Sequence, residues 1–376
     1  MDNLFNVDDI TVEMPNQTIG ENIAKISVIG VGGGGCNMIN HMIQEGTHKI
    51  DLIAANTDLQ VLHISKAPKK IQLGVKLTKG LGAGMKPEVG RDSAVESYED
   101  IKNAISGADI VFIAAGLGGG TGTGAAAIIA KAAKEVGALT VSVVTKPFTW
   151  EGKKRAGLAN LGLEELKKVS DSIIVVPNDR LLDIIDENVG MKDAFKIIDN
   201  ILYQAVNGMS EVILNPGNSD INTDFADVKT IMQHKGMALM GIGRAKGEDA
   251  AVHALEDAIE SPLLDKVSLS GAKGILIHFN IHPQVSLFAI NNVMGSIHDN
   301  IDSNAEIIFG TTSDSTLEKD EVKITIVATG FESKNEFDEE SNEDDNQEKN
   351  LKVSSNDENY LDIPPLMREY VVQYQL

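Results

Sequence analysis

The chain has 376 residues, of which 42% are hydrophobic, so it is long enough to form two domains of ordinary size with a large buried core. Its formal net charge of −22 argues against a general nucleic-acid binder, because affinity for nucleic acid comes mainly from cationic contacts. The single cysteine, Cys36, excludes an internal disulfide and a thiolate zinc cluster. The chain has no apolar run of about eighteen residues and no signal-peptide pattern at its start, so we expect no direct membrane insertion.

From Lys25 onward, short apolar runs alternate with helical stretches, which predicts a doubly wound α/β fold with a parallel sheet. The expected strands cover residues 25–31, 50–57, 108–115, 138–145 and 172–177. A long amphipathic helix follows at about 191–213. Beyond it, expected helices near 227–232 and 249–259 and expected strands at 274–281, 305–311 and 322–330 predict a smaller α+β domain with a mixed sheet.

Two glycine-rich turns each follow an expected strand. GLGGGTGTG at Gly116–Gly124 joins a strand to a helix, and a second run at Gly30–Gly35 closes the first strand. Glycines allow positive φ and close approach, and exposed N–H groups at a helix start favour phosphate oxygens. A lysine-containing P-loop of the form G-x-x-x-x-G-K-[ST] is absent from the sequence. We therefore expect backbone amides and threonine hydroxyls to hold phosphates.

One alternative is a Rossmann dinucleotide site. Gly30, Gly32 and Gly35 satisfy G-x-G-x-x-G, and Asp58 is placed to be the ribose ligand. This interpretation predicts an NAD-dependent oxidoreductase. It needs only one glycine turn, whereas the second and richer turn indicates a site assembled from several strand ends.

Further candidate residues follow other strands, where ligands of doubly wound sheets bind. They are Asn56, Thr57 and Asp58; the loop 80–90; Thr145, Lys146 and Pro147; Glu151 and Arg155; Asn178; and Phe195 with Asp199. Phe195 and Asp199 offer an aromatic face and a carboxylate suited to guanine. The alternatives are an ordinary helical ion pair for Glu151 with Arg155 and a core position for Phe195.

The last 45 residues differ in composition from the rest. Between Glu332 and Asn359 there are eleven acidic and three basic residues, which predicts a disordered linker. Apolar character returns in YLDIPPLMREYVVQYQL, which favours a recognition peptide over a frayed end without function. We expect a flexible extension over 1–24, a nucleotide domain over 25–190, a central helix over 191–214, a second domain over 215–330, a linker over 331–359 and a terminal peptide over 360–376.

Taken together, GVGGGGCN, AANTD, GLGAGMKPEVG, GGGTGTG, VTKPFTWEGKKR, PND and NTDFADV closely resemble the tubulin/FtsZ family, and in particular its bacterial cell-division branch. The resemblance covers about Lys25 to Gly330 in the expected order. LDIPPL resembles the terminal peptide by which such proteins engage membrane tethers such as FtsA.

The resemblance assigns site residues by position. It implies that GTP is bound by Gly33, Gly34, Gly35, Cys36, Asn37, Asn56, Asp58, Gly84, Gly120, Thr121, Gly122, Thr145, Pro147, Glu151, Arg155, Asn178, Phe195 and Asp199. Mg²⁺ would be held mainly through the nucleotide, near Asp58. The partner-binding tail would comprise Leu361, Asp362, Ile363, Pro364, Pro365 and Leu366.

The resemblance also implies an activity. Such proteins convert GTP to GDP and phosphate when they polymerise head to tail, because the next subunit supplies a loop that here contains Asn222, Asp224 and Asp227. On residues alone, Asp224 would instead be a helix N-cap, with Asp227 in the first turn. The implied setting is a cytoplasmic filament that forms the bacterial division ring at midcell, beneath the inner membrane. A relative that binds GTP without hydrolysing it is the remaining alternative.

Overall fold

The computed structural model describes residues 24–331, except for 48, 184, 186–188, 215–220, 222–223, 235, 262–263, 265–268 and 299–300. The predicted N-terminal extension, acidic linker and terminal peptide with Leu361–Leu366 therefore lie outside the described residues, as does Asn222. None of the helices in the described part of the chain combines the length and the apolar character that crossing a bilayer requires.

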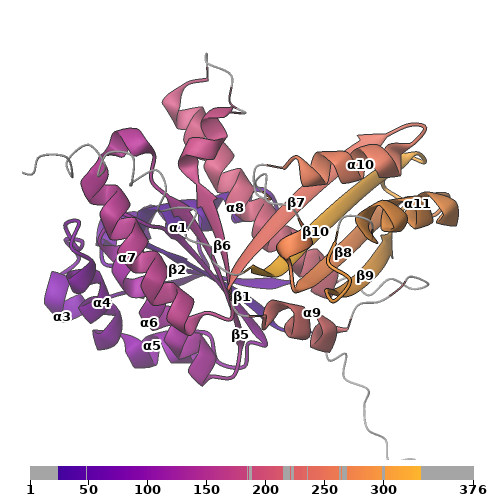
Figure 1. The fold of residues 1–376 in the computed structure, drawn as a ribbon. Helices are drawn as coiled ribbons and strands as arrows, with labels where there is room; N and C mark the ends of the chain where they lie inside the picture. Colours follow the sequence, from indigo (N-terminus) through magenta and orange to yellow (C-terminus); the bar gives the residue numbers. More distant parts are fainter. Residues whose placement is uncertain are drawn as a thin grey trace, which may run out of the picture. The chain divides into compact units, whose positions relative to one another are not determined.

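The first half of the described chain alternates strands with helices (Figure 1). Its strands are β1 (Ile26–Val31), β2 (Ile50–Asn56), β3 (Lys69–Gln72), β4 (Ile110–Gly116), β5 (Leu139–Lys146) and β6 (Ser172–Pro177). Its helices are α1 (Gly32–Gln44), α2 (Leu59–Ile64), α3 (Val75–Thr78), α4 (Pro87–Glu96), α5 (Tyr98–Ala104), α6 (Thr121–Glu135) and α7 (Lys153–Val169), with 3₁₀ turns η1 (Thr149–Glu151) and η2 (Asn178–Asp183).

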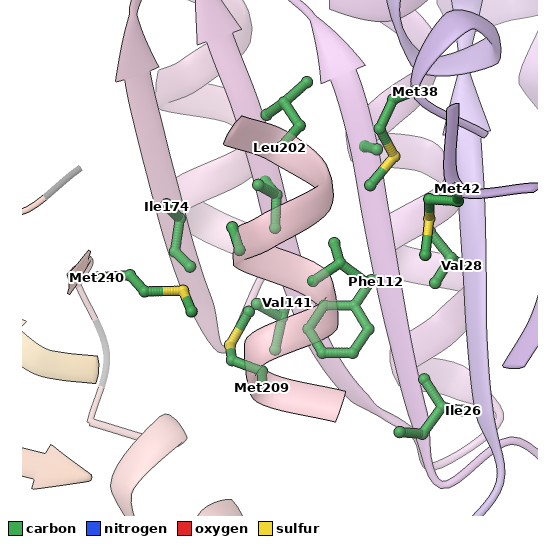
Figure 2. Packing of buried hydrophobic residues seen from close by; sticks show 14 of the residues in the cluster. Ile26, Val28, Met38, Met42, Phe112, Val141, Ile174, Leu202, Met209 and Met240 are labelled. Carbon is green, nitrogen blue, oxygen red and sulfur yellow. The ribbon is translucent and has the colours of Figure 1, made fainter. Parts of the chain in front are cut away.

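These six strands are all parallel and lie in the order β3-β2-β1-β4-β5-β6. Alternate residues of each strand face opposite sides of the sheet, as the two-residue period of a strand requires. In β1, Ile26 and Val28 pack in the cluster that contains α1 and the long helix α8 (Met191–Leu214), whereas Ile29 and Val31 pack in the cluster of α4 to α7. Figure 2 shows α8 lying over the sheet, with Leu202 and Met209 among the core side chains.

The second half adds four strands to the same sheet. These are β7 (Met237–Lys246), β8 (Gly274–Ile281), β9 (Glu306–Ser313) and β10 (Glu321–Phe331), and they extend the order as β6-β7-β10-β8-β9. Strand β10 is antiparallel to β7 and to β8, so this half of the sheet is mixed. Its helices are α9 (Phe225–Met232), α10 (Ala250–Ile259) and α11 (Leu287–His298), with the 3₁₀ turn η3 (Leu269–Gly271).

The predicted fold class is confirmed: the chain is α/β, with a parallel sheet, a long central helix and a later part containing antiparallel strands. The elements that the sequence did not predict include β3, β7 and α11. The sequence of β7, MALMGIGRAK, contains few β-branched residues, and the sequence of β3, KKIQ, is short and polar. Both strands form because neighbouring strands pair with them, which overrides weak local preference.

Helices α4 and α6 approach each other through glycines. A Cβ built on Gly124 of α6 would lie 1.9 Å from the carbonyl oxygen of Pro87, and one built on Gly90 of α4 would lie 2.4 Å from the carbonyl oxygen of Gly120. Side chains at these positions would push the helix backbones apart. The glycines are therefore packing requirements that fix α4 against the start of α6.

We expect Gly124→Ala to lower the unfolding free energy by about 2–3 kcal/mol, the usual range for overpacking a tight contact. The control is Gly157→Ala, because Gly157 lies in α7 with open space around its Cβ position. That control is expected to be neutral or stabilising by about 0.5–1 kcal/mol through helix propensity. Denaturant unfolding of both variants measures the difference, and equal midpoints would contradict the packing argument.

Candidate nucleotide site

Two helix N-termini meet at the carboxyl ends of β1 and β4. Helix α1 begins at Gly32 (φ +73°) directly after β1, and α6 begins at Thr121 after the turn that follows β4. A Cβ on Gly32 would lie 2.8 Å from the backbone nitrogen of Gly122, so the two backbones are nearly in contact. Neither helix has an acidic residue in its first turn. The free N–H groups and the aligned dipoles make this junction attractive to anions.

The junction opens into a cavity of about 490 Å³. Its walls come from both glycine turns, the ends of β4 to β6 and the first half of α8. The lining residues are Gly33, Gly34, Asn37, Met85, Gly116, Leu117, Gly119, Gly120, Thr121, Gly122, Thr145, Pro147, Glu151, Arg155, Asn178, Phe195, Ile198, Asp199 and Leu202. Residues from six segments of the chain, 33–37, 85, 116–122, 145–155, 178 and 195–202, are thus brought to one place, as expected where a doubly wound sheet reverses its winding.

One end of the cavity combines an aromatic ring with two hydrogen-bonding groups. Burial raises the pKa of the Asp199 carboxyl to about 6, and the nearby His41 partly opposes that rise. The Asn178 amide oxygen is buried, and none of the described residues donates a hydrogen bond to it. An unpartnered buried acceptor is costly, so this oxygen fits a donor on a bound molecule. Phe195 is partly exposed beside these groups.

The loop between β5 and α7 forms another wall. Glu151 pairs with Arg155 through Oε2, and its Oε1 accepts a hydrogen bond from the Phe148 backbone N–H at 2.9 Å. The Phe148 ring stacks on Trp150 with centroids 5.3 Å apart, and it meets the Phe195 ring edge-on at 6.2 Å. The loop therefore links the ion pair to the aromatic end of the cavity.

Five of the predicted nucleotide-binding residues do not line the cavity, namely Gly35, Cys36, Asn56, Asp58 and Gly84. Cys36 is fully buried, and this burial raises the pKa of its thiol to about 11. Asn56 donates to the Cys36 sulfur at 3.8 Å. The Asp58 carboxylate caps α2 by accepting from the Gln60 N–H at 2.8 Å. The described contacts of these three side chains are thus within the protein.

The predicted catalytic residues Asp224 and Asp227 lie outside the cavity lining, at the start of α9. Asp224 occupies the N-cap position with extended backbone, but its side chain makes no capping hydrogen bond. Asp227 lies in the first turn of α9. Among the described residues, the Asp224 side chain is therefore not used for capping α9.

Six lining residues were not assigned individually, although Met85 lies in the loop 80–90 that the sequence singled out: Met85, Gly116, Leu117, Gly119, Ile198 and Leu202. Gly116, Leu117 and Gly119 belong to the turn that the sequence did single out. Ile198 and Leu202 share the helical face of Phe195 at three- or four-residue spacing, so that periodicity was an available signal. Met85 has φ +58°, a conformation rare for a residue with a side chain, and the sequence gives no sign of it.

The cavity therefore offers a glycine-lined end suited to phosphates and an end suited to a planar, hydrogen-bonding base. Among the described residues, no group of three His, Cys, Asp or Glu side chains is arranged to hold a metal ion. The arrangement fits a nucleoside di- or triphosphate.

Comparison with known proteins decides the family. A family model described as Tubulin/FtsZ family, GTPase domain, matches residues 25–186, and one described as FtsZ family, C-terminal domain, matches residues 236–332. An empty FtsZ dimer from M. jannaschii is similar at 46% identity, with a TM-score of 0.75, covering 82% of this chain and 88% of its own. The chain belongs to the tubulin/FtsZ family.

Other solved structures are also similar. A mutant of the M. jannaschii FtsZ matches with the same identity and TM-score and with 91% of its chain covered. CetZ2 from Haloferax volcanii, solved as a GTPγS-bound protofilament, matches with a TM-score of 0.72 at 19% identity, over 86% of this chain and 99% of its own. At that identity the likeness shows the fold alone.

As a tubulin/FtsZ protein, the chain is a tubulin-like cytoskeletal GTPase that binds GTP and GDP. This sets aside both an NAD-dependent oxidoreductase and a relative that does not hydrolyse GTP. The match to the family GTPase domain ends at residue 186 of this chain. Phe195 and Asp199 lie beyond it, on helix α8.

We expect Gly33→Ala to weaken GTP binding without harming the fold. Gly33 lines the cavity in the first turn of α1, and open space surrounds its Cβ position. A methyl group there would take space at the glycine-lined end of the cavity, and we expect affinity to fall by about tenfold or more, the effect of losing one or more charge-assisted hydrogen bonds. Equilibrium binding of GTP, with melting temperature as the folding control, checks this. Unchanged affinity would remove Gly33 from the phosphate site.

The Asp199 carboxyl predicts a pH dependence. Only the ionised form accepts both guanine N–H donors, and its raised pKa of about 6 means that it takes up a proton as the pH falls through 6. We expect GTP affinity to fall by up to about tenfold per pH unit below that value. Asp199→Asn is the control. Its side chain cannot ionise, so any pH dependence that it retains comes from titration of the GTP phosphates. Parallel pH curves for the two proteins would refute the assignment.

Proposed function

We propose that this protein polymerises head to tail into dynamic filaments, and that the catalytic loop of the adjacent subunit completes each GTP site. The observation that supports this is the charge pattern of the cavity. The acidic residues among its described lining are Glu151 and Asp199, and both come from segments other than the two glycine turns. Glu151 is paired with Arg155. Within the described part of one chain, neither glycine turn carries a carboxylate that could orient the attacking water.

The missing groups are available elsewhere on the molecule. Asp224 and Asp227 sit at the start of α9, outside the cavity lining, and Asp224 makes no capping bond. Hydrolysis of a γ-phosphate needs an oriented water and neutralised charge more than covalent help. We propose that Asn222, Asp224 and Asp227 of one subunit supply the former. Backbone amides of the next subunit would neutralise the phosphate charge together with Mg²⁺ carried by the nucleotide, and Asp58 is the residue that we propose to lie near that ion.

Exposed apolar side chains support contact between copies. Leu81 and Met85 are 85% and 42% exposed on the glycine-rich loop beside the cavity. In the second half of the chain, Ile221, Leu287 and Phe288 are 48%, 75% and 80% exposed. Two different apolar surfaces favour a head-to-tail contact, which extends into an open filament when it does not close. The relatives include an FtsZ dimer and a CetZ2 protofilament.

The domain assignment proposed here follows the expected division. Residues 25–190 form the GTP-binding domain, 191–214 the central helix and 215–330 the C-terminal domain with the catalytic loop. The order of the matched family segments, 25–186 and then 236–332, supports this division. We propose GTP contacts for all eighteen residues assigned by resemblance, with Gly35, Cys36 and Gly84 contributing only backbone groups.

The proposed cellular role is the bacterial division ring, with cytoplasmic filaments assembling at midcell beneath the inner membrane. Residues 361–366 would bind membrane tethers such as FtsA and other division regulators through a recognition peptide at the end of the acidic linker. Motif resemblance of LDIPPL supports this role.

The shared site is tested by Asp227→Ala. Because Asp227 is not part of the cavity lining, we expect GTP affinity within about twofold of the wild type and turnover lowered by at least about 100-fold, a typical loss on removing a water-positioning group. Asp257→Ala on α10 serves as the control for removing an exposed acid. Turnover per subunit and light scattering are recorded against concentration. For the wild type, turnover proportional to protein from the lowest concentration would show that each monomer owns a complete site.

Mixing variants gives a sharper result. Gly33→Ala damages the pocket and keeps the loop, whereas Asp227→Ala damages the loop and keeps the pocket. Where the two meet in a mixed filament, an intact pocket faces an intact loop, so the mixture should turn over GTP faster than the two separate proteins combined. A mixture no faster than their combined rates would indicate that catalysis occurs within one chain.

A further inference from the structure

Asp179 lies outside the cavity lining, directly after Asn178, yet its carboxylate holds a segment that does line it. The Thr149 backbone N–H donates to Asp179 Oδ1 at 2.9 Å and to Oδ2 at 3.2 Å, and the Thr149 hydroxyl donates to Oδ2 at 2.6 Å. These bonds join two loops that are thirty residues apart in the chain. They tie the loop after β5 to the turn after β6.

The loop that Thr149 belongs to carries groups for both ends of the cavity. On one side of Thr149, Phe148 is buried and meets the Phe195 ring edge-on. On the other side, Trp150 stacks on Phe148, and Glu151 pairs with Arg155. Pro147 itself lines the cavity. A shift of Thr149 would therefore displace the aromatic contact and the ion pair together.

Asp179 has no role in the hydrophobic core, since its hydrogen bonds to Thr149 are exposed to solvent. Among the described residues, the side-chain hydrogen bonds of Asp179 go to Thr149, which is the first residue of η1. The Asp179 charge also faces the half-buried Lys146, whose pKa is lowered first by burial and then by Lys167, and raised in part by Asp179. The backbone N–H and the hydroxyl of one distant residue are thus both held by the Asp179 carboxylate.

We propose that Asp179 is a positioning residue for nucleotide binding, which clamps the loop Pro147–Glu151 to the turn that presents Asn178. The clamp sets the distance between the base-binding groups and the Glu151–Arg155 pair before the nucleotide arrives. A pre-positioned loop binds more tightly because less conformational entropy is lost on binding. The inference rests on the proposed nucleotide contacts of the cavity, and it adds a residue that those contacts do not include.

The test uses the full chain with Asp179→Ala, Asp179→Asn and Thr149→Val, and with Glu165→Ala as the control for an exposed acid on α7. GTP affinity is measured below the assembly threshold, and KM and kcat are measured above it. We expect Asp179→Ala to raise Kd and KM by about tenfold, the scale of losing charge-assisted hydrogen bonds. kcat at saturating GTP should stay within about twofold of the wild-type value. The lost bonds stabilise bound GTP and the transition state equally, so their loss raises KM and leaves kcat unchanged.

The two milder variants separate the bonds. Thr149→Val loses the hydroxyl and keeps the backbone N–H, so its effect should be smaller than that of Asp179→Ala. Asp179→Asn keeps an acceptor for the N–H and should restore most of the affinity. Combining Thr149→Val with Asp179→Ala should add nothing to Asp179→Ala, because the hydroxyl has then already lost its acceptor.

Trp150 gives an independent readout, because it is the only tryptophan in the chain. Its fluorescence should become more accessible to a neutral quencher in Asp179→Ala and stay unchanged in Glu165→Ala. If Asp179→Ala folds poorly, Asp179→Asn and Thr149→Val carry the test. Wild-type Kd, KM and Trp150 quenching in a folded Asp179→Ala would overturn the inference while leaving GTP binding by the protein intact. A wild-type chain that fails to bind GTP would instead overturn the proposed site.

Discussion

The site depends on the near-contact between two backbone turns at the ends of β1 and β4. Helices α1 and α6 can start side by side only because Gly32 carries no side chain where their backbones meet, with 2.8 Å between the Gly32 Cβ position and the Gly122 nitrogen. This closeness points two helix dipoles and two sets of free N–H groups at one volume. Backbone groups thereby take the place that a lysine side chain holds in a P-loop.

Much of this arrangement was readable from the sequence, because its causes are local. The strand-to-helix turns need glycine at fixed places, and buried parallel strands need unbroken apolar runs, so the parallel half of the sheet and both turns could be predicted. The resemblance then assigned thirteen residues that the structure places in the cavity lining. The motif at Gly116–Gly124 does not by itself show which glycine has which role. Gly119 lines the cavity, whereas Gly124 at the end of the motif allows α4 to pack closely.

What could not be predicted depends on contacts between distant segments. Asp58 matches a ligand position by motif, but its side chain caps α2. The Cys36 side chain follows the phosphate turn in sequence and yet points into the core, since the first turn of α1 rotates it away from the cavity. Strand β7 forms through its pairing with β10, which lies about eighty residues later in the chain. The Asp179–Thr149 bonds are of the same kind, because no local pattern reveals them.

The join between the two halves of the sheet has a mechanical consequence. Strands β6 and β7 share two residue pairs, Ile173 with Met237 and Ile174 with Ala238, whereas β7 and β10 pair along most of their length. Along that line the sheet is held mainly by side chains and by α8, which packs against β7 and β10 at Gly208. Sliding of one half of the sheet past the other would therefore break few backbone hydrogen bonds between β6 and β7. A filament under tension would therefore deform inside each subunit at this line, before any other strand pair of the sheet gives way.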